Sequence, residues 1–463
     1  MFKRALIRSV YLAMIVIVAG AFSAASAQTP RKDREQANQL MREGDRAFDQ
    51  RNYAIALDKY KQSITLFPGN AYAHYRKGFA HYYLKEYAEA IPEYDEALKL
   101  GYKPPEIFKV RWYPHYALKN YDLALLDLNQ SIASEPNNVE LLRTAGDIYF
   151  DKGDFAEASN AYRRAILKAP SNGDLHYRLA LSRSKANDIE GQAASAEDAI
   201  RLNTTFLADA WLLLATARHS QKRMPEAIDA YSKALAAKPD KYEAYRELAE
   251  LYRGQSRFNE AIEISKAGLR RFPNDGKIYT DLSWFYSLAG RTDDAIAAGR
   301  SATQLLPKEY LGYTNLCRAY YEAKKPELAV GACNSALRLQ PEDGETLFYL
   351  GRANNDLGKT AEADKFYRRA VAGLLEYTKN NPDYSDGFYL LGNAYAEVGQ
   401  NAKAIEAYKK CLALNPRFTK ANFNIGIMQI IEKNKAGALE QYNALLQTDK
   451  ALAEKLKAEI DKL

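Results

Sequence analysis

The apolar and polar positions between Leu142 and Pro170 predict two amphipathic helices joined by a tight polar turn. The turn falls at residues 151–154, where Asp and Gly are typical turn residues. Small side chains, Gly146 on the first helix and Ala158 on the second, lie where the two helices must approach closely. We expect the second helix to stop before Pro170, because proline lacks the N–H that a continuing helix needs.

The same arrangement returns along the chain at a nearly constant interval. The alanine that opens the second helix recurs every 34 residues, apart from one step of 69 and one of 41. The step of 69 divides into 35 and 34 when Gln192 takes the alanine position. The alanines of this column are Ala56, Ala90, Ala124, Ala158, Ala227, Ala261, Ala295, Ala329, Ala363, Ala404 and Ala438.

Further columns keep the same period, and together they define about twelve repeats from Arg34 to Thr448. The small residues of the first helix are Gly44, Gly78, Gly146, Ala180, Ala215, Ala249, Ser283, Cys317, Gly351, Gly392 and Gly426. The aromatic residues of the second helix are Tyr60, Tyr94, Tyr162, Tyr231, Tyr367, Tyr408 and Tyr442. The helix-stopping prolines are Pro68, Pro136, Pro170, Pro239, Pro273, Pro307, Pro341 and Pro416.

This pattern resembles the tetratricopeptide repeat, whose signature has Gly and Tyr on the first helix and Ala, an aromatic, Ala and Pro on the second. The hairpin at 142–170 carries all of these residues. The resemblance implies an all-α fold, a right-handed superhelical solenoid of antiparallel helix pairs. It also implies a non-catalytic scaffold that binds other proteins or peptide segments on a concave groove lined by the first helices.

Three repeats depart from the pattern. Trp112 occupies the small position of the third repeat and Pro114 follows, so we expect its first helix to be short, kinked or displaced. In the fifth repeat Gln192 and Ala196 replace the usual Ala and aromatic, which predicts looser packing. The tenth repeat has seven extra residues, and the helical pattern over 370–377 predicts a second helix about two turns longer.

The two ends of the chain differ from the repeats. Residues 1–27 have a basic start, an apolar run and a small-x-small site, and so resemble a secretory signal peptide; the alternative is an uncleaved anchor. Residues 28–33 are expected to be a short linker. Residues 449–463 carry one apolar stripe, Leu452, Leu456, Ile460 and Leu463, which predicts a helix that caps the last repeat.

Composition narrows the classes of function. Apolar residues make up 47% and charged residues 27%, so the chain can bury a core. Its formal charge of +7 includes Lys3, Arg4 and Arg8 of the expected signal. The sequence shows no basic stripe of the kind that would predict nucleic-acid binding. We therefore expect an exported protein of the periplasm or cell envelope, or a secreted one, with no stable membrane span after signal removal.

Searches for chemistry are negative. No nucleophile elbow, phosphate-binding loop, HExxH or CxxC occurs, so we expect neither an enzyme nor a cofactor or metal site. Cys317 and Cys333 occupy facing positions of one hairpin and could form a disulfide, or they could be two small buried side chains. Cys411 is expected to be buried.

Aromatic and arginine side chains on the first helices are the candidates for partner binding, since these residue types anchor interfaces. Inter-repeat packing is an equal alternative for those of the second repeat. The candidates are Tyr72, Tyr75, Arg76, Phe79, Tyr82, Tyr83, Tyr113, Tyr116, Arg143, Phe150, Tyr177 and Arg178. Later inward positions include Arg253, Trp284 and Arg318. Asn393, Lys420 and Asn424 match part of the clamp with which some family members hold acidic tails, but Tyr389 replaces its lysine, so that function is not expected here.

Three functions remain open. The leading one is a protein-interaction scaffold in an exported or cell-envelope assembly. The second is a carbohydrate- or cell-wall-binding module that stacks sugar rings on the tyrosine-rich groove. The third is an enzyme with an unrecognised site, which the empty motif search disfavours.

Overall fold

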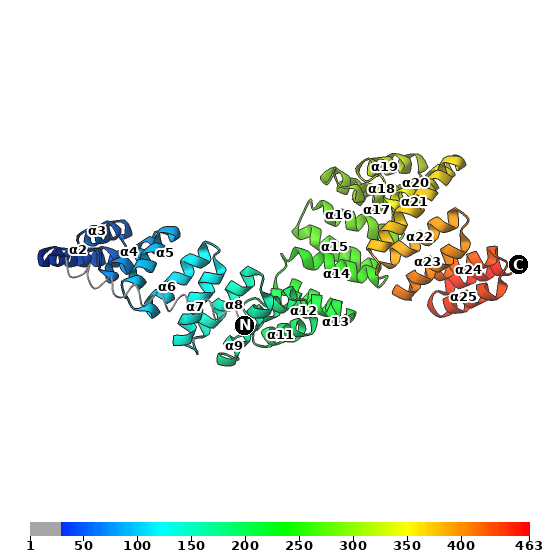
Figure 1. Cartoon of the computed structure of the whole chain (residues 1–463). Helices are drawn as coiled ribbons and strands as arrows, with labels where there is room; N and C mark the ends of the chain where they lie inside the picture. Colours follow the sequence, from blue (N-terminus) through cyan, green and yellow to red (C-terminus); the bar gives the residue numbers. More distant parts are fainter. Residues whose placement is uncertain (1–28) are drawn as a thin grey trace, which may run out of the picture. The chain divides into compact units, whose positions relative to one another are not determined.

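The computed structural model describes residues 29–463, and the expected signal at 1–27 lies outside them. The described chain contains helices and no strand (Figure 1). It divides into two compact units, with the boundary between Arg223 and Met224. In both units consecutive helices pack as hairpins, in which the even-numbered helix is the first and the odd-numbered helix the second.

The first unit comprises α2 (Arg31–Asp49), α3 (Tyr53–Leu66), α4 (Ala71–Tyr83), α5 (Tyr87–Lys99), α6 (Pro104–Ala117), α7 (Tyr121–Ser134), α8 (Val139–Lys152), α9 (Phe155–Lys168), α10 (Gly173–Lys185), α11 (Ile189–Arg201) and α12 (Leu207–Ser220). Helix α2 begins at Arg31, so the last three residues of the expected linker are helical.

The second unit comprises α13 (Met224–Ala237), α14 (Tyr242–Gly254), α15 (Phe258–Arg271), α16 (Gly276–Leu288), α17 (Thr292–Leu305), α18 (Tyr310–Glu322), α19 (Pro326–Leu339), α20 (Gly344–Asp356), α21 (Thr360–Asn380), α22 (Ser385–Glu397), α23 (Asn401–Leu414), α24 (Thr419–Ile431), α25 (Lys435–Thr448) and α26 (Lys450–Ile460). The last helix buries Leu456 and Ile460 against α24 and α25, as expected of a cap.

A glycine on the first helix and a tyrosine on the second form the centre of the regular hairpins. A Cβ atom on Gly351 would lie 2.7 Å from the ring of Tyr367, and one on Gly78 would lie 2.9 Å from the ring of Tyr94. No other residue allows the ring this close to the helix backbone. The same contact joins glycine to Tyr60, Tyr162 and Tyr408.

The hydroxyl of that tyrosine ties one repeat to the next. Asp147, directly after Gly146 on α8, accepts a hydrogen bond from the Tyr162 hydroxyl at 2.8 Å through Oδ1. The same oxygen accepts from Nη1 of Arg178, on the next first helix α10, at 2.9 Å. We call the residue that follows the small residue of each first helix the tie position. The tie therefore joins both helices of one hairpin to the following hairpin.

The tie recurs with identical sequence offsets, 15 residues to the tyrosine and 31 to the partner on the next repeat. Bond lengths lie between 2.8 and 2.9 Å in each case. The two further ties are formed by Asp45 with Tyr60 and Arg76, and by Asn393 with Tyr408 and Asn424.

In the second repeat the tie is absent. Phe79 occupies the tie position and Val110 the partner position on the next repeat, and neither can accept a hydrogen bond. The Tyr94 hydroxyl consequently has no hydrogen-bond partner among the described residues, although the side chain is fully buried. Burial raises the pKa of Tyr94, so the hydroxyl stays neutral.

Two of the predicted irregularities have different outcomes. Helix α21 has 21 residues, whereas most second helices have 14, so the two-turn extension is confirmed. Helix α6 is a full 14-residue helix, so the expectation that it is short is wrong. Pro104 and Pro105 occupy its first turn, where the missing N–H costs no hydrogen bond. Leu128 takes the aromatic position opposite Trp112, so the large and small members of this pair are exchanged.

The fifth repeat compensates for its unusual residues. Gln192 is buried, and its Nε2 donates to the Leu213 carbonyl at 2.7 Å and to Thr216 Oγ1 at 2.8 Å. These bonds link α11 to α12, so polar contacts of Gln192 join the fifth repeat, for which we predicted looser packing, to the sixth. In the ninth repeat Cys317 and Cys333 form a disulfide with Cα atoms 5.1 Å apart, in place of the glycine–tyrosine contact. Cys411 is free and buried.

The tie predicts a sharp difference between two conservative substitutions. Tyr162→Phe removes a hydrogen bond to a carboxylate and should lower the free energy of unfolding by about 1.5–3 kcal/mol. Tyr94→Phe removes a buried hydroxyl without a partner and should be neutral or stabilising. Urea unfolding, with hydrogen exchange of α5 and α9 as local readouts, measures both. Equal losses for the two variants would contradict the role of the tie.

His115 predicts a pH dependence of stability. Burial is the largest cause that lowers its pKa; Arg111 acts in the same direction, and Asp127 and Asp95 oppose it. The unfolded chain therefore takes up this proton more readily, so the stabilisation is present above about pH 6.5 and is lost as the pH falls through the lowered pKa. The urea midpoint of the protein should fall from pH 7.5 to pH 5, and less steeply in His115→Phe. An unchanged slope in that variant would contradict the assignment.

Candidate binding surface

Aromatic rings form a continuous surface on the first unit. The rings of Phe48 and Phe79 stack 5.4 Å apart, and Phe79 lies 5.1 Å from Tyr83, edge to face. Tyr75 stacks on Phe79 at 5.9 Å, and on Tyr102 at 4.6 Å. We call this surface the aromatic band; its members are Phe48, Tyr53, Tyr72, Tyr75, Phe79, Tyr82, Tyr83, Tyr87, Tyr102, Tyr113 and Tyr116.

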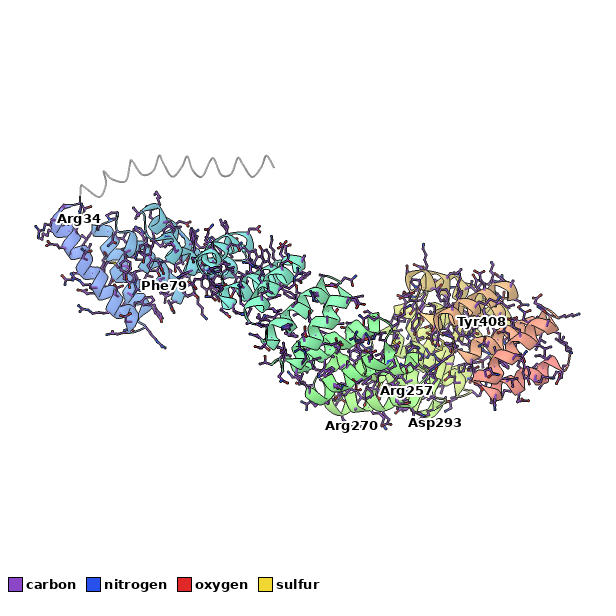
Figure 2. The ribbon with its side chains drawn as sticks, turned by 90° about the horizontal axis from the view of Figure 1, so that it is seen from below. Arg34, Phe79, Arg257, Arg270, Asp293 and Tyr408 are labelled. Carbon is purple, nitrogen blue, oxygen red and sulfur yellow. A yellow bond between two sulfur atoms is a disulfide. The ribbon has the colours of Figure 1, made fainter. Side chains whose placement is uncertain are left out.

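The band extends from α2 over α4 to α6. Tyr82 on α4 contacts Tyr113 on α6 at 5.5 Å, and Tyr113 lies 6.1 Å from Tyr116. Phe79, labelled in Figure 2, is on α4 near the middle of the band. Seven of the twelve predicted partner-binding residues are therefore members of one surface.

The rings of the band remain partly open to solvent. Tyr72 is 41% and Tyr83 44% exposed, and the other members of the band are half-buried. Burial raises the pKa of Tyr75 to about 12, and a hydrogen bond to Asp151 raises that of Tyr116 to about 12. The hydroxyls are consequently neutral donors at physiological pH. The band thus combines apolar ring faces with hydrogen-bonding edges.

The predicted arginines are engaged within the fold. The Arg76 guanidinium lies 4.4 Å from the centre of the Phe48 ring and binds Asp45, so it supports the edge of the band. Arg143 pairs with Glu140 and Asp147, and Arg178 pairs with Asp147. The positive charge of all three is balanced by neighbouring carboxylates.

Phe150 and Tyr177 lie outside the band. Phe150 contacts Phe155 at 5.3 Å, and Tyr177 stacks on Phe206 at 4.6 Å. Together with Arg143 and Arg178, they are on α8 and α10. These four predicted residues share the first-helix face with the band but make none of its ring contacts.

Sequence reasoning missed four members of the band: Phe48, Tyr53, Tyr87 and Tyr102. The signal for Phe48 was present, because it holds the same repeat position as Tyr82, Tyr116 and Phe150. Tyr53 and Tyr87 begin second helices and Tyr102 lies in a connection, so a search of first helices alone could not find them.

In the second unit the inward side chains bind one another. Arg253 on α14 donates from Nη1 to Asp386 on α22 at 2.9 Å, across 133 residues of sequence. Its guanidinium also binds Glu250 and lies 4.6 Å from the centre of the Trp284 ring. Arg318 pairs with Glu345. The arginines and the tryptophan that we placed on a binding face are thus part of a buried network.

Asn393 and Asn424 also have a structural role. Both belong to the tie of Tyr408, a residue of α23 that is labelled in Figure 2. Their resemblance to part of an acidic-tail clamp follows from this repeat position. Among residues 29–463 no group of three potential metal ligands is found, and no helix there is long and apolar enough to cross a membrane.

The fold and the repeated contacts define an all-α protein of helix-hairpin repeats. Sequence models of the tetratricopeptide repeat match six stretches of the chain, some of which overlap: residues 41–102, 146–185, 177–242, 218–283, 314–383 and 385–418. The chain belongs to the tetratricopeptide repeat family.

Comparison with individual proteins finds distant similarity. Stress-induced-phosphoprotein 1 of Caenorhabditis elegans is 22% identical, over 43% of this chain and 73% of that protein. Two solved structures are also similar to this chain. Cut9–Hcn1 of the APC/C has 14% identity, covers 92% of this chain and 96% of its own, and has a TM-score of 0.38. A tetratricopeptide repeat protein from Parabacteroides merdae has 13% identity, coverage of 55% and 98%, and a TM-score of 0.40. Likeness at this level says nothing about partners.

The bridge between Arg253 and Asp386 predicts a large effect on stability. Arg253→Ala leaves the largely buried Asp386 carboxylate without its partner and should lower the free energy of unfolding by about 3 kcal/mol. Arg257→Ala is the matched control, because this exposed arginine directly before α15 pairs with the half-exposed Glu260 and lies over the Tyr252 ring, and its loss should cost about 1 kcal/mol or less. Urea unfolding with hydrogen exchange of α22 measures the difference. Similar values for the two variants would contradict the bridge.

Proposed function

We propose that this protein is a non-catalytic scaffold of an exported or cell-envelope assembly, which binds segments of partner proteins on the aromatic band. The observation that carries the proposal is the band itself, a set of stacked rings that stay partly exposed on α2, α4 and α6. Aromatic side chains bury a large area with few rotatable bonds, so they bind partners at a low cost in conformational entropy.

The second and third repeats support a role in binding through what they lack. Phe79 and Tyr113 occupy the tie position, where Asp45 and Asp147 join repeats elsewhere. Because Phe79 cannot accept a hydrogen bond, the hydroxyl of Tyr94 in the second repeat is left unpaired, which is a cost to stability. Residues that lower stability and place rings at a partly exposed surface are typical of functional surfaces.

Two features support an exported setting. The basic start, apolar run and small-x-small site of residues 1–27 are those of a secretory signal. The disulfide between Cys317 and Cys333 is suited to an oxidising compartment, such as the periplasm.

A carbohydrate- or cell-wall-binding module is the second candidate. Tyrosine rings with neutral hydroxyls could stack on sugar rings and donate hydrogen bonds to them. The two candidates differ in what the band retains, a protein or a glycan.

The decisive experiment is affinity capture from the envelope fraction of the source cells with purified protein. Tyr72→Ala/Tyr83→Ala truncates the two most exposed rings of the band and should reduce capture of a specific protein partner at least tenfold. Ile55→Ala is the control, since Ile55 is 55% exposed on α3, the other helix of the first hairpin, and should leave capture unchanged. Retention on insoluble glycan without any protein partner would overturn the scaffold and favour the second candidate.

A further inference from the structure

The second unit contains a cavity of about 430 Å³ among α16, α18, α20, α21 and α22. Four aromatic rings line it: Trp284, Tyr310, Tyr377 and Tyr384. The Tyr384 ring lies 6.0 Å from Tyr377 and 6.4 Å from Trp284. The cavity is large enough for one or two amino-acid side chains, and one wall consists of ring faces and edges.

Carboxylates outnumber cations around this cavity. Its lining includes Asp281, Glu342, Asp343, Glu345 and Glu376, but Arg318 is the one arginine or lysine among the lining residues. Three of these five carboxylates pair with an arginine, and Asp343 and Glu376 do not, so the lining keeps a surplus of carboxylates that favours a cation.

Glu376 is the carboxylate most available to a ligand. Glu342 pairs with Arg369, and Asp343 caps the N-terminus of α20. The side chain of Glu376 is exposed on α21 and makes no hydrogen bond or ion pair within residues 29–463. It can therefore bind a cation without giving up an existing partner.

The same rings already hold a guanidinium of this protein. Arg253 lies 4.6 Å from the centre of the Trp284 ring and 5.6 Å from that of Tyr384. A cation over an aromatic face is attracted by the ring quadrupole, most strongly where water is excluded. The rings of Tyr310 and Tyr377, over which no cation lies among the described residues, offer the same interaction to a second cation.

Arg318 indicates that the ligand should also carry a hydrogen-bond acceptor. The side chain is 95% buried, since its exposure is 5%, and its Nε has no hydrogen-bond partner among the described residues. A buried donor without an acceptor is costly, and an acceptor oxygen brought by a ligand would remove that cost. The ligand should thus carry a positive charge and an acceptor, as a basic residue of a peptide does.

We infer that this cavity binds the arginine or lysine side chain of a partner protein segment, with a backbone carbonyl of that segment next to Arg318. The inference rests on the proposed function as a binder of protein segments, but it assigns a second site that shares no residue with the aromatic band. The partner it fits is a basic segment, in contrast to the acidic tails that some members of the family bind.

The test is a ligand-observed NMR titration of the purified protein with acetyl-arginine amide. Acetyl-citrulline amide, which has the same shape without the charge, should bind at least tenfold more weakly. Glu376→Gln should weaken arginine binding roughly threefold, and Glu327→Gln, an exposed glutamate of α19 outside the cavity, should not change it. Tyr377→Ala, which removes a half-exposed ring of the wall, should weaken binding without loss of fold.

Three outcomes would overturn the inference: no binding of the arginine probe, equal binding of the citrulline probe, or binding only of a soluble N-acetylglucosamine tetrasaccharide. The site is separable from the aromatic band. Tyr72→Ala/Tyr83→Ala should leave the arginine titration unchanged, and Glu376→Gln should leave capture by the band unchanged. Loss of one activity alone therefore shows which of the two proposals has failed.

Discussion

The contact between a first-helix glycine and a second-helix tyrosine is the interaction on which the regular hairpins depend. It fixes how closely the two helices approach, because any Cβ on the glycine would enter the ring. It also directs the tyrosine hydroxyl to the tie position and so toward the next hairpin. A single buried ring thereby sets the geometry within a repeat and the join between repeats.

Once the ring secures the hairpin, the tie position is free to vary. It holds Asp45 and Asp147 where repeats are tied, and Phe79 and Tyr113 where the aromatic band lies. In the second unit Glu250, Trp284 and Arg318 occupy it in three successive repeats, and all three contact the network around the buried arginines Arg253 and Arg318. The residue at this one position thus determines whether a hairpin forms a tie to the next repeat, adds an aromatic side chain to the band or adds a charged side chain to the network.

The periodic part of the structure could be predicted from the sequence, and the contacts between distant repeats could not. Columns at a 34-residue interval identify the helices, the longer α21 and the cap, since each depends on local pattern. The band was found in large part because its rings fall on neighbouring first helices. The pair of Arg253 and Asp386 is 133 residues apart and leaves no periodic trace, because it depends on how several hairpins accumulate their rotation.

The expectation that α6 is short was wrong for a physical reason that also bears on function. In other repeats a tyrosine of the second helix packs on a glycine of the first, and we expected Trp112 in place of that glycine to disturb the helix. In this repeat the second helix has Leu128 in place of the tyrosine, so the larger side chain is on the first helix and the smaller one on the second. A residue that breaks a repeat pattern is therefore informative only together with the position it faces. By the same reasoning, the effect of Phe79 depends on Tyr94 of the second helix, whose hydroxyl has no partner among the described residues. A phenylalanine at position 94 would have no hydroxyl to satisfy, and this part of the second repeat would be apolar.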